Sequence, residues 1–147
     1  MKDYKKEIAG DLARVHKEFE NLREAQKLLT LEKREEVTDL LLSGTAYHLQ
    51  LLYTGFEKIA EKTLAANGIV LTNDGSYHKN LLDKYFEKFL FTVSEQFLLK
   101  ELRGFRHVVR SAYGFDLAMP SITDKLTAVM NEWPAIESKI RNYVGLP

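Results

Sequence analysis

Residues 40–56 read LLLSGTAYHLQLLYTGF and carry the strongest fold signal in the chain. Apolar residues fall on nearly every face of a helix built from this stretch, which is typical of a helix buried at the centre of a bundle. The helical pattern continues in both directions, so we expect one long helix from about residue 30 to residue 66. Asn67 and Gly68 then end it, because both residues favour helix C-termini. The stretch predicts an all-α protein arranged around this helix.

The segment before the central helix predicts a partner for it. Residues 3–29 place apolar side chains at alternating three- and four-residue steps, from Ile8 to Leu29. This spacing gives one narrow seam, suited to packing along another helix or, in a dimer, against a second copy. The charged run 32–36 between the two segments is interpreted as the solvated first turn of the central helix, since early acids suit a helix N-terminus.

Three further helices are expected after the central one. Ser76 should cap a short helix over 77–90. Thr92-Val93-Ser94-Glu95 matches a capping box and opens the next helix, which should end at Gly114. The stretch 120–124 opens the last helix, which carries apolar residues at three- and four-residue steps from Ile122 to Tyr143. Pro134 should introduce a kink in this helix or split it in two. The fold class is therefore all-α, an antiparallel bundle of four to five helices forming one domain over residues 1–147.

Composition narrows the cellular setting of the chain. Lys and Arg together number 21, as do Asp and Glu, so the net charge is zero and no global basic field attracts nucleic acid. There are no cysteines, which excludes disulfides and thiolate metal sites. No stretch approaches the roughly 20 apolar residues that span a bilayer. We expect a cytoplasmic protein with no membrane partner.

Residues 103–114, RGFRHVVRSAYG, hold three arginines, a histidine and a tyrosine with no acid among them. At about 100° per residue, a single arc of about 120° holds most of the polar members of this cluster, with Ser111 at its border. The members of that arc are Arg103, Arg106, His107, Arg110 and Tyr113. The opposite side is apolar and suits packing into the bundle.

Two interpretations of this arginine face compete at this point. The simpler one is a solvated face whose arginines pair with acids elsewhere in the fold. Against it, no carboxylate lies three or four residues from Arg106 or Arg110, where a surface helix often places one. Arginine is also preferred to lysine here, and its planar, bidentate donors suit phosphate. Phosphate binding by Arg103, Arg106 and Arg110 is therefore the more specific of the two hypotheses.

The segment Arg106-His107-Val108-Val109-Arg110-Ser111-Ala112-Tyr113 resembles the Arg-x-x-x-x-His-x-Tyr signature of HepT-like toxins in the HEPN superfamily. TGFEKIAEK at 54–62 and GSYHKNLLDKYF at 75–86 look like the second and third helices of the same family. The resemblance implies a HEPN-like helical bundle that dimerises with its motif helices facing each other. It also implies a metal-independent ribonuclease, paired with a small nucleotidyltransferase antitoxin of the MNT type.

The resemblance assigns roles to individual residues. Arg106 would stabilise the charge that builds on the phosphate oxygens of RNA, with transfer RNA as one candidate substrate. Tyr113 would orient the phosphate or receive the AMP with which the antitoxin silences the toxin. No cofactor and no metal are implied, and no pair of histidines has metal-ligand spacing.

This sequence departs from the family signature at one position. Ser111 stands where the signature has histidine, and a serine hydroxyl is a poor general base near neutral pH. The chain is then a natural pseudo-ribonuclease, a deliberately inactivated variant, or an enzyme in which His107 moves the proton instead. A separate class of function also stays open: a non-catalytic helical binding module that partners a nucleotidyltransferase.

The remaining histidines are assigned from their surroundings in the sequence. His16 and His48 lie on separate helices among packing residues, and we expect both to be structural. His78 begins a short helix inside a segment that resembles the family, so a peripheral role at an RNA cleft is the alternative to a structural one.

Overall fold

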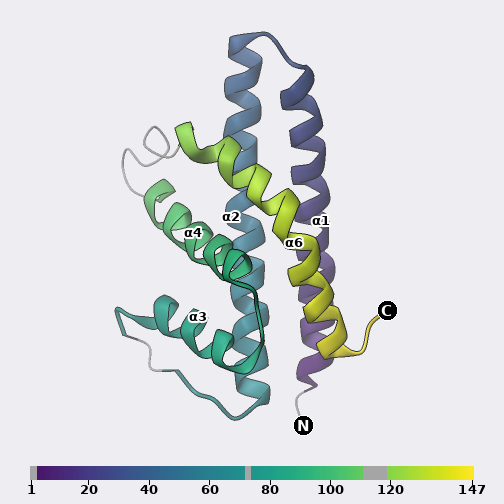
Figure 1. The fold of residues 1–147 in the computed structure, drawn as a ribbon, viewed down its shortest axis with the longest axis vertical. Coiled ribbons are helices and arrows are strands. Elements are labelled where there is room, and N and C mark those ends of the chain that lie inside the picture. The colour runs from purple at the N-terminus through teal and green to yellow at the C-terminus, as the bar shows by residue number, and fades with distance from the viewer. Residues whose placement is uncertain (1–2, 72–73, 111–118) are drawn as a thin grey trace.

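The computed structural model describes residues 3–71, 74–110 and 119–147. Within these ranges it contains helices and no strand, in the order α1 (Tyr4–Leu31), α2 (Glu35–Ala66), α3 (Tyr77–Lys88), α4 (Val93–Val109), a short 3-10 turn (Met119–Ser121) and α6 (Ile122–Val144). The helices α1 and α2 form a long antiparallel hairpin, and α3, α4 and α6 pack along it (Figure 1). The predicted all-α bundle is confirmed.

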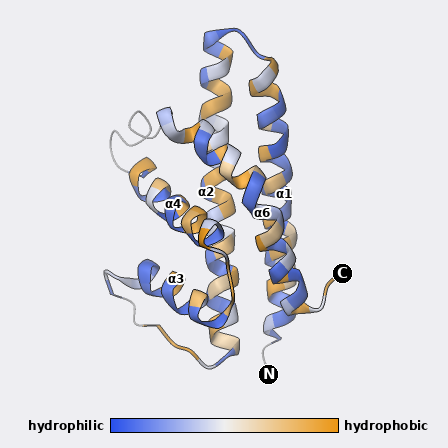
Figure 2. Cartoon of the chain, in the orientation of Figure 1, coloured by the Kyte–Doolittle hydropathy of each residue, from blue (hydrophilic) through white to orange (hydrophobic). Residues whose placement is uncertain are grey.

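The central position of α2 follows from its apolar surface. It contacts α1, α3, α4 and α6, and Leu52, Phe56 and Ile59 are fully buried within it. Hydrophobic residues recur along α2 where the other helices cover it (Figure 2). At Gly55 an added Cβ would collide with the Val15 side chain of α1, so the glycine permits close approach of the two helices. The expected buried spine is confirmed.

The two outer seams are also confirmed as packing surfaces. On α1 and α6 the buried apolar residues are those at the predicted three- and four-residue steps: Ile8, Leu12, Val15, Phe19 and Leu22, and Ile122, Leu126, Val129, Trp133, Ile136 and Ile140. Because the α1 seam is buried inside the bundle, it is not available for contact with a second copy. The expectation that this seam could serve a dimer is wrong.

The connection between α1 and α2 differs from the prediction. The central helix begins at Glu35, not near residue 30, because residues 32–34 form the turn of the hairpin. The guanidinium of Arg34 donates to Glu32 at 2.8 Å (Nε to Oε1), and the backbone N–H of Arg34 donates to the same oxygen at 3.0 Å. The hydrogen bonds from Arg34 lower the pKa of Glu32 to about 2. Residues 32–34 of the charged run therefore stabilise a turn, while Glu35 and Glu36 form the acidic first turn of α2, as predicted.

Capping explains where α3 and α4 begin. Ser76 is the N-cap residue of α3, as predicted, but its side chain makes no capping bond and instead donates to Asp74 at 2.6 Å. The capping box of Thr92 and Glu95 is confirmed in full. Burial works against ionisation of Glu95, but bonds from Lys139 and Thr92 outweigh it and lower the pKa. Since Lys139 belongs to α6, this ion pair also holds the start of α4 in place.

The α4 helix ends earlier than predicted. Its last residue is Val109, and Arg110 caps it with a backbone N–H bond to the Arg106 carbonyl at 3.2 Å. The predicted end at Gly114 is therefore wrong, and Gly114 itself lies outside the described residues. Like charges three and four residues apart, as in Arg103, Arg106 and Arg110, weaken the last turns of α4.

The last helix is continuous. It runs from Ile122 to Val144 with Pro134 inside it, so the predicted split is wrong. Trp133 and Ile136 are fully buried on either side of the proline, and this packing holds the helix together. Pro134 itself lies on the exposed side, where water can satisfy the carbonyl that its missing N–H leaves unpaired. None of the helices in the described part of the chain is both long and apolar enough to cross a bilayer.

Candidate functional site

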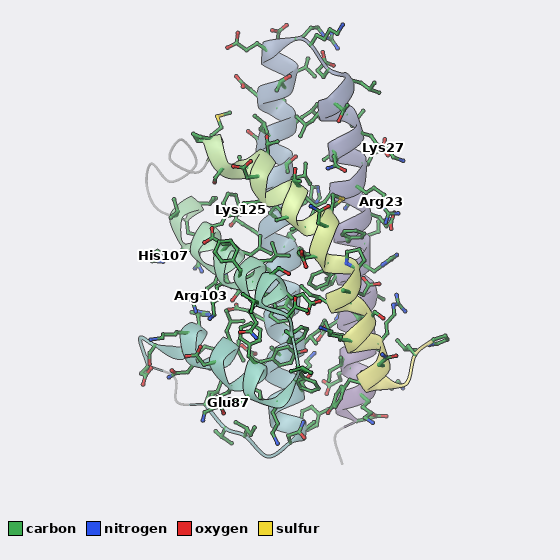
Figure 3. The ribbon with its side chains drawn as sticks, viewed as in Figure 1. Arg23, Lys27, Glu87, Arg103, His107 and Lys125 are labelled. Atoms are coloured by element: carbon green, nitrogen blue, oxygen red, sulfur yellow. The ribbon has the colours of Figure 1, made fainter. Side chains whose placement is uncertain are left out.

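A pocket of about 390 Å³ opens between α2, α3 and α4. Its walls combine side chains from three separate parts of the sequence: Tyr53 and Glu57 from α2, Gly75, His78 and Lys79 from the start of α3, and Arg103, Gly104, Arg106, His107 and Arg110 from α4 and its cap. Figure 3 shows Arg103 reaching from α4 toward α3, with His107 farther along the same helix. The arginine cluster of the sequence therefore lines a concave site.

The pocket is strongly positive. Among the described residues that line it are four basic side chains, Arg103, Arg106, Arg110 and Lys79, and one carboxylate, that of Glu57. The apolar side of α4 explains this arrangement, because Leu102 and Phe105 are buried in the core and turn the arginines toward α3. A site with several cations against one anion favours a ligand that carries negative charge.

Glu57 is the electrostatic centre of this pocket. Its side chain is only 6% exposed, and each carboxylate oxygen has a partner. Arg106 donates from Nη1 to Oε1, and the Nδ1 atom of His78 lies 2.7 Å from Oε2. A buried carboxylate is tolerated when it is paired and hydrogen-bonded in this way. One side chain of α2 therefore orients a group from α4 and a group from α3.

The sequence left open whether the arginines pair with acids elsewhere in the fold or bind phosphate, and the structure answers this for Arg106. Its partner carboxylate comes from α2, 49 positions away, so the interpretation of arginines paired with acids elsewhere is right for Arg106. The ion pair uses one of the five N–H groups of the guanidinium. The other groups have no hydrogen-bond partner among the described residues, so Arg106 keeps donors for a ligand.

Tyr53 forms part of the pocket wall beside Glu57. Burial, followed by the negative charge of Glu57, raises the pKa of Tyr53 well above its usual range. The phenol therefore stays protonated at neutral pH and can donate a hydrogen bond, but it cannot act as a base. Tyr77, which packs edge-to-face against the ring of His78, also has a raised pKa, of about 12, through burial and a hydrogen bond to Glu61.

The structure brings four of the sequence-predicted residues together. Arg103, Arg106, His107 and Arg110 all line the pocket. Ser111 and Tyr113 lie outside the described residues. His78, for which the sequence left a peripheral role open, also lines the pocket.

The other two histidines lie away from the pocket and connect helices. His16 of α1 lies 3.1 Å from Glu137 of α6 (Nδ1 to Oε2), and His48 of α2 lies 2.6 Å from Glu18 of α1 (Nδ1 to Oε2). Within the described ranges, no group of three histidine or acidic side chains is arranged to hold a metal ion.

Sequence reasoning missed Tyr53, Glu57 and Lys79. A signal for Glu57 was present, because it lies four residues after Tyr53 and three before Ala60 on a helix face that is otherwise apolar. A charged residue at such a position is buried and needs partners. Nothing in the local sequence indicates that those partners come from α3 and α4.

Glu57→Gln should lower the free energy of unfolding by about 2 kcal/mol, because it leaves the partly buried Arg106 without its counter-charge. Glu101→Gln is the matched control, since Glu101 pairs with Lys125 between α4 and α6 but is 43% exposed; it should leave stability almost unchanged. Urea unfolding at pH 7 measures both. Equal effects of the two changes would contradict the central role of Glu57.

Comparison with known proteins identifies the family. A family model described as HepT-like protein matches residues 44–146, which cover α3, α4, α6 and most of α2. No curated protein and no solved structure matches the chain. The family match spans every element that lines the pocket and agrees with the resemblance seen in the arginine motif. The chain belongs to the HepT-like family of the HEPN superfamily.

Proposed function

We propose that this protein is the toxin component of a HEPN/MNT toxin–antitoxin pair and acts as a metal-independent endoribonuclease. The observation that carries the proposal is the positive pocket, whose described lining holds Arg103, Arg106 and Arg110 with the buried carboxylate of Glu57, which pairs with Arg106. Membership of the HepT-like family supports the class of activity. RNA, with transfer RNA as a candidate, is the substrate that supplies phosphate groups to the pocket.

The proposed chemistry needs positive charge at the scissile phosphate. The 2′-hydroxyl of RNA attacks the adjacent phosphorus, and negative charge builds on the non-bridging oxygens. Arg106, held in place by Glu57, donates its remaining N–H groups to those oxygens. Arg103 and Arg110 bind the phosphates of neighbouring nucleotides.

The proton transfers are where this chain departs from the motif, because Ser111 stands at the position of the motif histidine. Three explanations remain: a natural pseudo-ribonuclease, a deliberately inactivated variant, and proton transfer by His107. The position of His107 on the pocket wall supports the third. Ser111 itself supports the second class of function, in which the protein is a non-catalytic module that still binds the partner nucleotidyltransferase.

The ribonuclease proposal is tested by incubating the protein with total RNA. Ser111→His should raise cleavage by orders of magnitude, since it restores the general base of the motif. In that background Arg110→Ala should weaken cleavage, because it removes a phosphate contact. Arg23→Ala is the matched control, since Arg23 is exposed on α1 and pairs with Glu20 outside the pocket.

Two outcomes would redirect this proposal. Equal cleavage by the protein and its Ser111→His variant, with His107→Ala abolishing both, would assign the proton transfer to His107. Binding of RNA without cleavage by any variant would leave the binding module as the function.

We further propose that the protein forms a homodimer around α4. Two copies would double the number of arginines along an RNA strand, and apolar contacts must offset their repulsion. Val93 and Phe97 supply such contacts, since both are exposed large hydrophobic residues on α4 itself. Light scattering at micromolar concentration should give the mass of two chains, and a monomer would contradict the proposal.

The proposed antitoxin acts on Tyr113. A cognate nucleotidyltransferase would transfer AMP from ATP to the phenol oxygen and release pyrophosphate, while Arg106 and Arg110 hold the nucleotide phosphate. The added charge and bulk would then occupy the RNA-phosphate site. After incubation with the partner and ATP–Mg²⁺, mass spectrometry should find AMP on the peptide that contains Tyr113. Label that persists in Tyr113→Phe would show that another residue is modified.

A further inference from the structure

The pocket contains a second imidazole that the family motif does not account for. His78 enters from α3, outside the motif helix, and lines the same pocket as Arg106 and His107. Cleavage of RNA by its own 2′-hydroxyl needs two proton transfers, one from the attacking hydroxyl and one to the leaving 5′ oxygen. The motif histidine position accounts for one transfer at most.

Glu57 holds His78 in one orientation. The Nδ1 atom of the imidazole lies 2.7 Å from the carboxylate, which accepts a hydrogen bond from it. The ring of Tyr77 packs edge-to-face against the imidazole, with 5.5 Å between ring centroids. With Nδ1 engaged, Nε2 is the atom left to meet a ligand, and it has no partner among the described residues. The side chain is 52% exposed, so a substrate can reach it.

The same carboxylate couples His78 to the phosphate-binding arginine. Arg106 occupies one oxygen of Glu57 and His78 the other. The two groups therefore keep a fixed relation to each other, although they come from different helices. A phosphate bound by Arg106 lies in the pocket that the imidazole also lines, which is the arrangement that acid catalysis of a leaving group requires.

His107 is placed differently. It lines the pocket from α4 and is exposed, but no carboxylate of the described residues contacts it. Its ring therefore lacks the orientation that Glu57 gives to His78. Of the two imidazoles in the pocket, His78 is the one held in place for proton transfer.

We propose that His78 is the general acid of this site and protonates the leaving 5′ oxygen. This inference rests on the proposed ribonuclease function. The bond between the 2′ oxygen and phosphorus forms while the bond between phosphorus and the 5′ oxygen breaks. The reacting form of His78 is the imidazolium, which carries a proton on each ring nitrogen. The 5′ oxygen takes the proton from Nε2 while Nδ1 keeps its proton toward Glu57, and a base takes the proton of the 2′-hydroxyl. The products are a 2′,3′-cyclic phosphate and a 5′-hydroxyl, and His78 regains its proton from water.

The test compares two substrates that differ in their need for an acid. One is an oligoribonucleotide spanning a cleavage site mapped in total RNA. The other carries sulfur in place of the leaving 5′ oxygen, because a thiolate leaves without protonation. The enzymes are the full chain and its Ser111→His variant, each with and without His78→Gln, which removes the proton donor and keeps a similar volume.

The matched control is His48→Gln. His48 pairs with Glu18 through Nδ1 in the same way as His78 pairs with Glu57, but it lies outside the pocket. A loss of activity caused only by a broken histidine–glutamate pair would appear in both variants. A loss caused by a missing acid would appear in His78→Gln alone.

We expect His78→Gln to lower kcat on the oxygen substrate by at least about 100-fold. On the sulfur substrate its kcat should return close to that of the parent, and His48→Gln should match the parent on both. Restored cleavage of the sulfur substrate also shows that the variant is folded.

Three results would overturn the role of His78 alone: unchanged cleavage by His78→Gln, a loss that persists on the sulfur substrate, or sulfur-rescued loss in His107→Gln instead. In each of these the parent still cuts RNA, so the proposed function stands. No cleavage by the protein or by Ser111→His overturns the proposed function, and the general acid with it.

Discussion

A negative charge inside a protein must be paired, and the pocket of this protein depends on one such charge. The carboxylate of Glu57 is almost completely buried, and its two oxygens contact Arg106 and His78. These contacts join α2, α3 and α4 at one point. Without the carboxylate, nothing in the described residues would hold the guanidinium of Arg106 and the imidazole of His78 in a fixed relation to each other.

The bundle places this carboxylate where it can act. The α2 helix is covered on several sides, so a glutamate one turn beyond Tyr53 is buried even though it is charged. The start of α4 is held by the capping box and by the ion pair between Glu95 and Lys139. Because both helices are anchored in the core, the distance between Glu57 and the arginines is set by packing and not by the arginines themselves.

The proposed ribonuclease function combines a complete electrostatic site with an incomplete motif. In that proposal the arginines supply charge stabilisation, which does not require a titratable group at position 111. Proton transfer is the separate requirement, and the pocket contains two imidazoles besides the motif position. In this proposal, RNA binding and proton transfer depend on different side chains, so a variant can lose catalysis and still bind RNA. The same pocket therefore fits both a binding role and an enzymatic role.

The sequence by itself determined the helices and their buried faces. Apolar spacing predicted the central helix and the seams of α1 and α6, because periodicity follows directly from helix geometry. It also predicted that Arg103, Arg106, His107 and Arg110 share one face. Helix ends were less predictable: α2 began later and α4 ended earlier, because turn hydrogen bonds and repulsion between like charges compete with helical propensity.

Only the tertiary structure decided what the arginine face meets. The partner of Arg106 lies 49 residues away on α2, and the partner of Glu57's second oxygen lies on α3. Local spacing carries no information about contacts between helices, since these depend on how the whole core packs. The sequence could show that a buried glutamate and an unpaired arginine each needed a partner, and the fold determined that they are partners of each other.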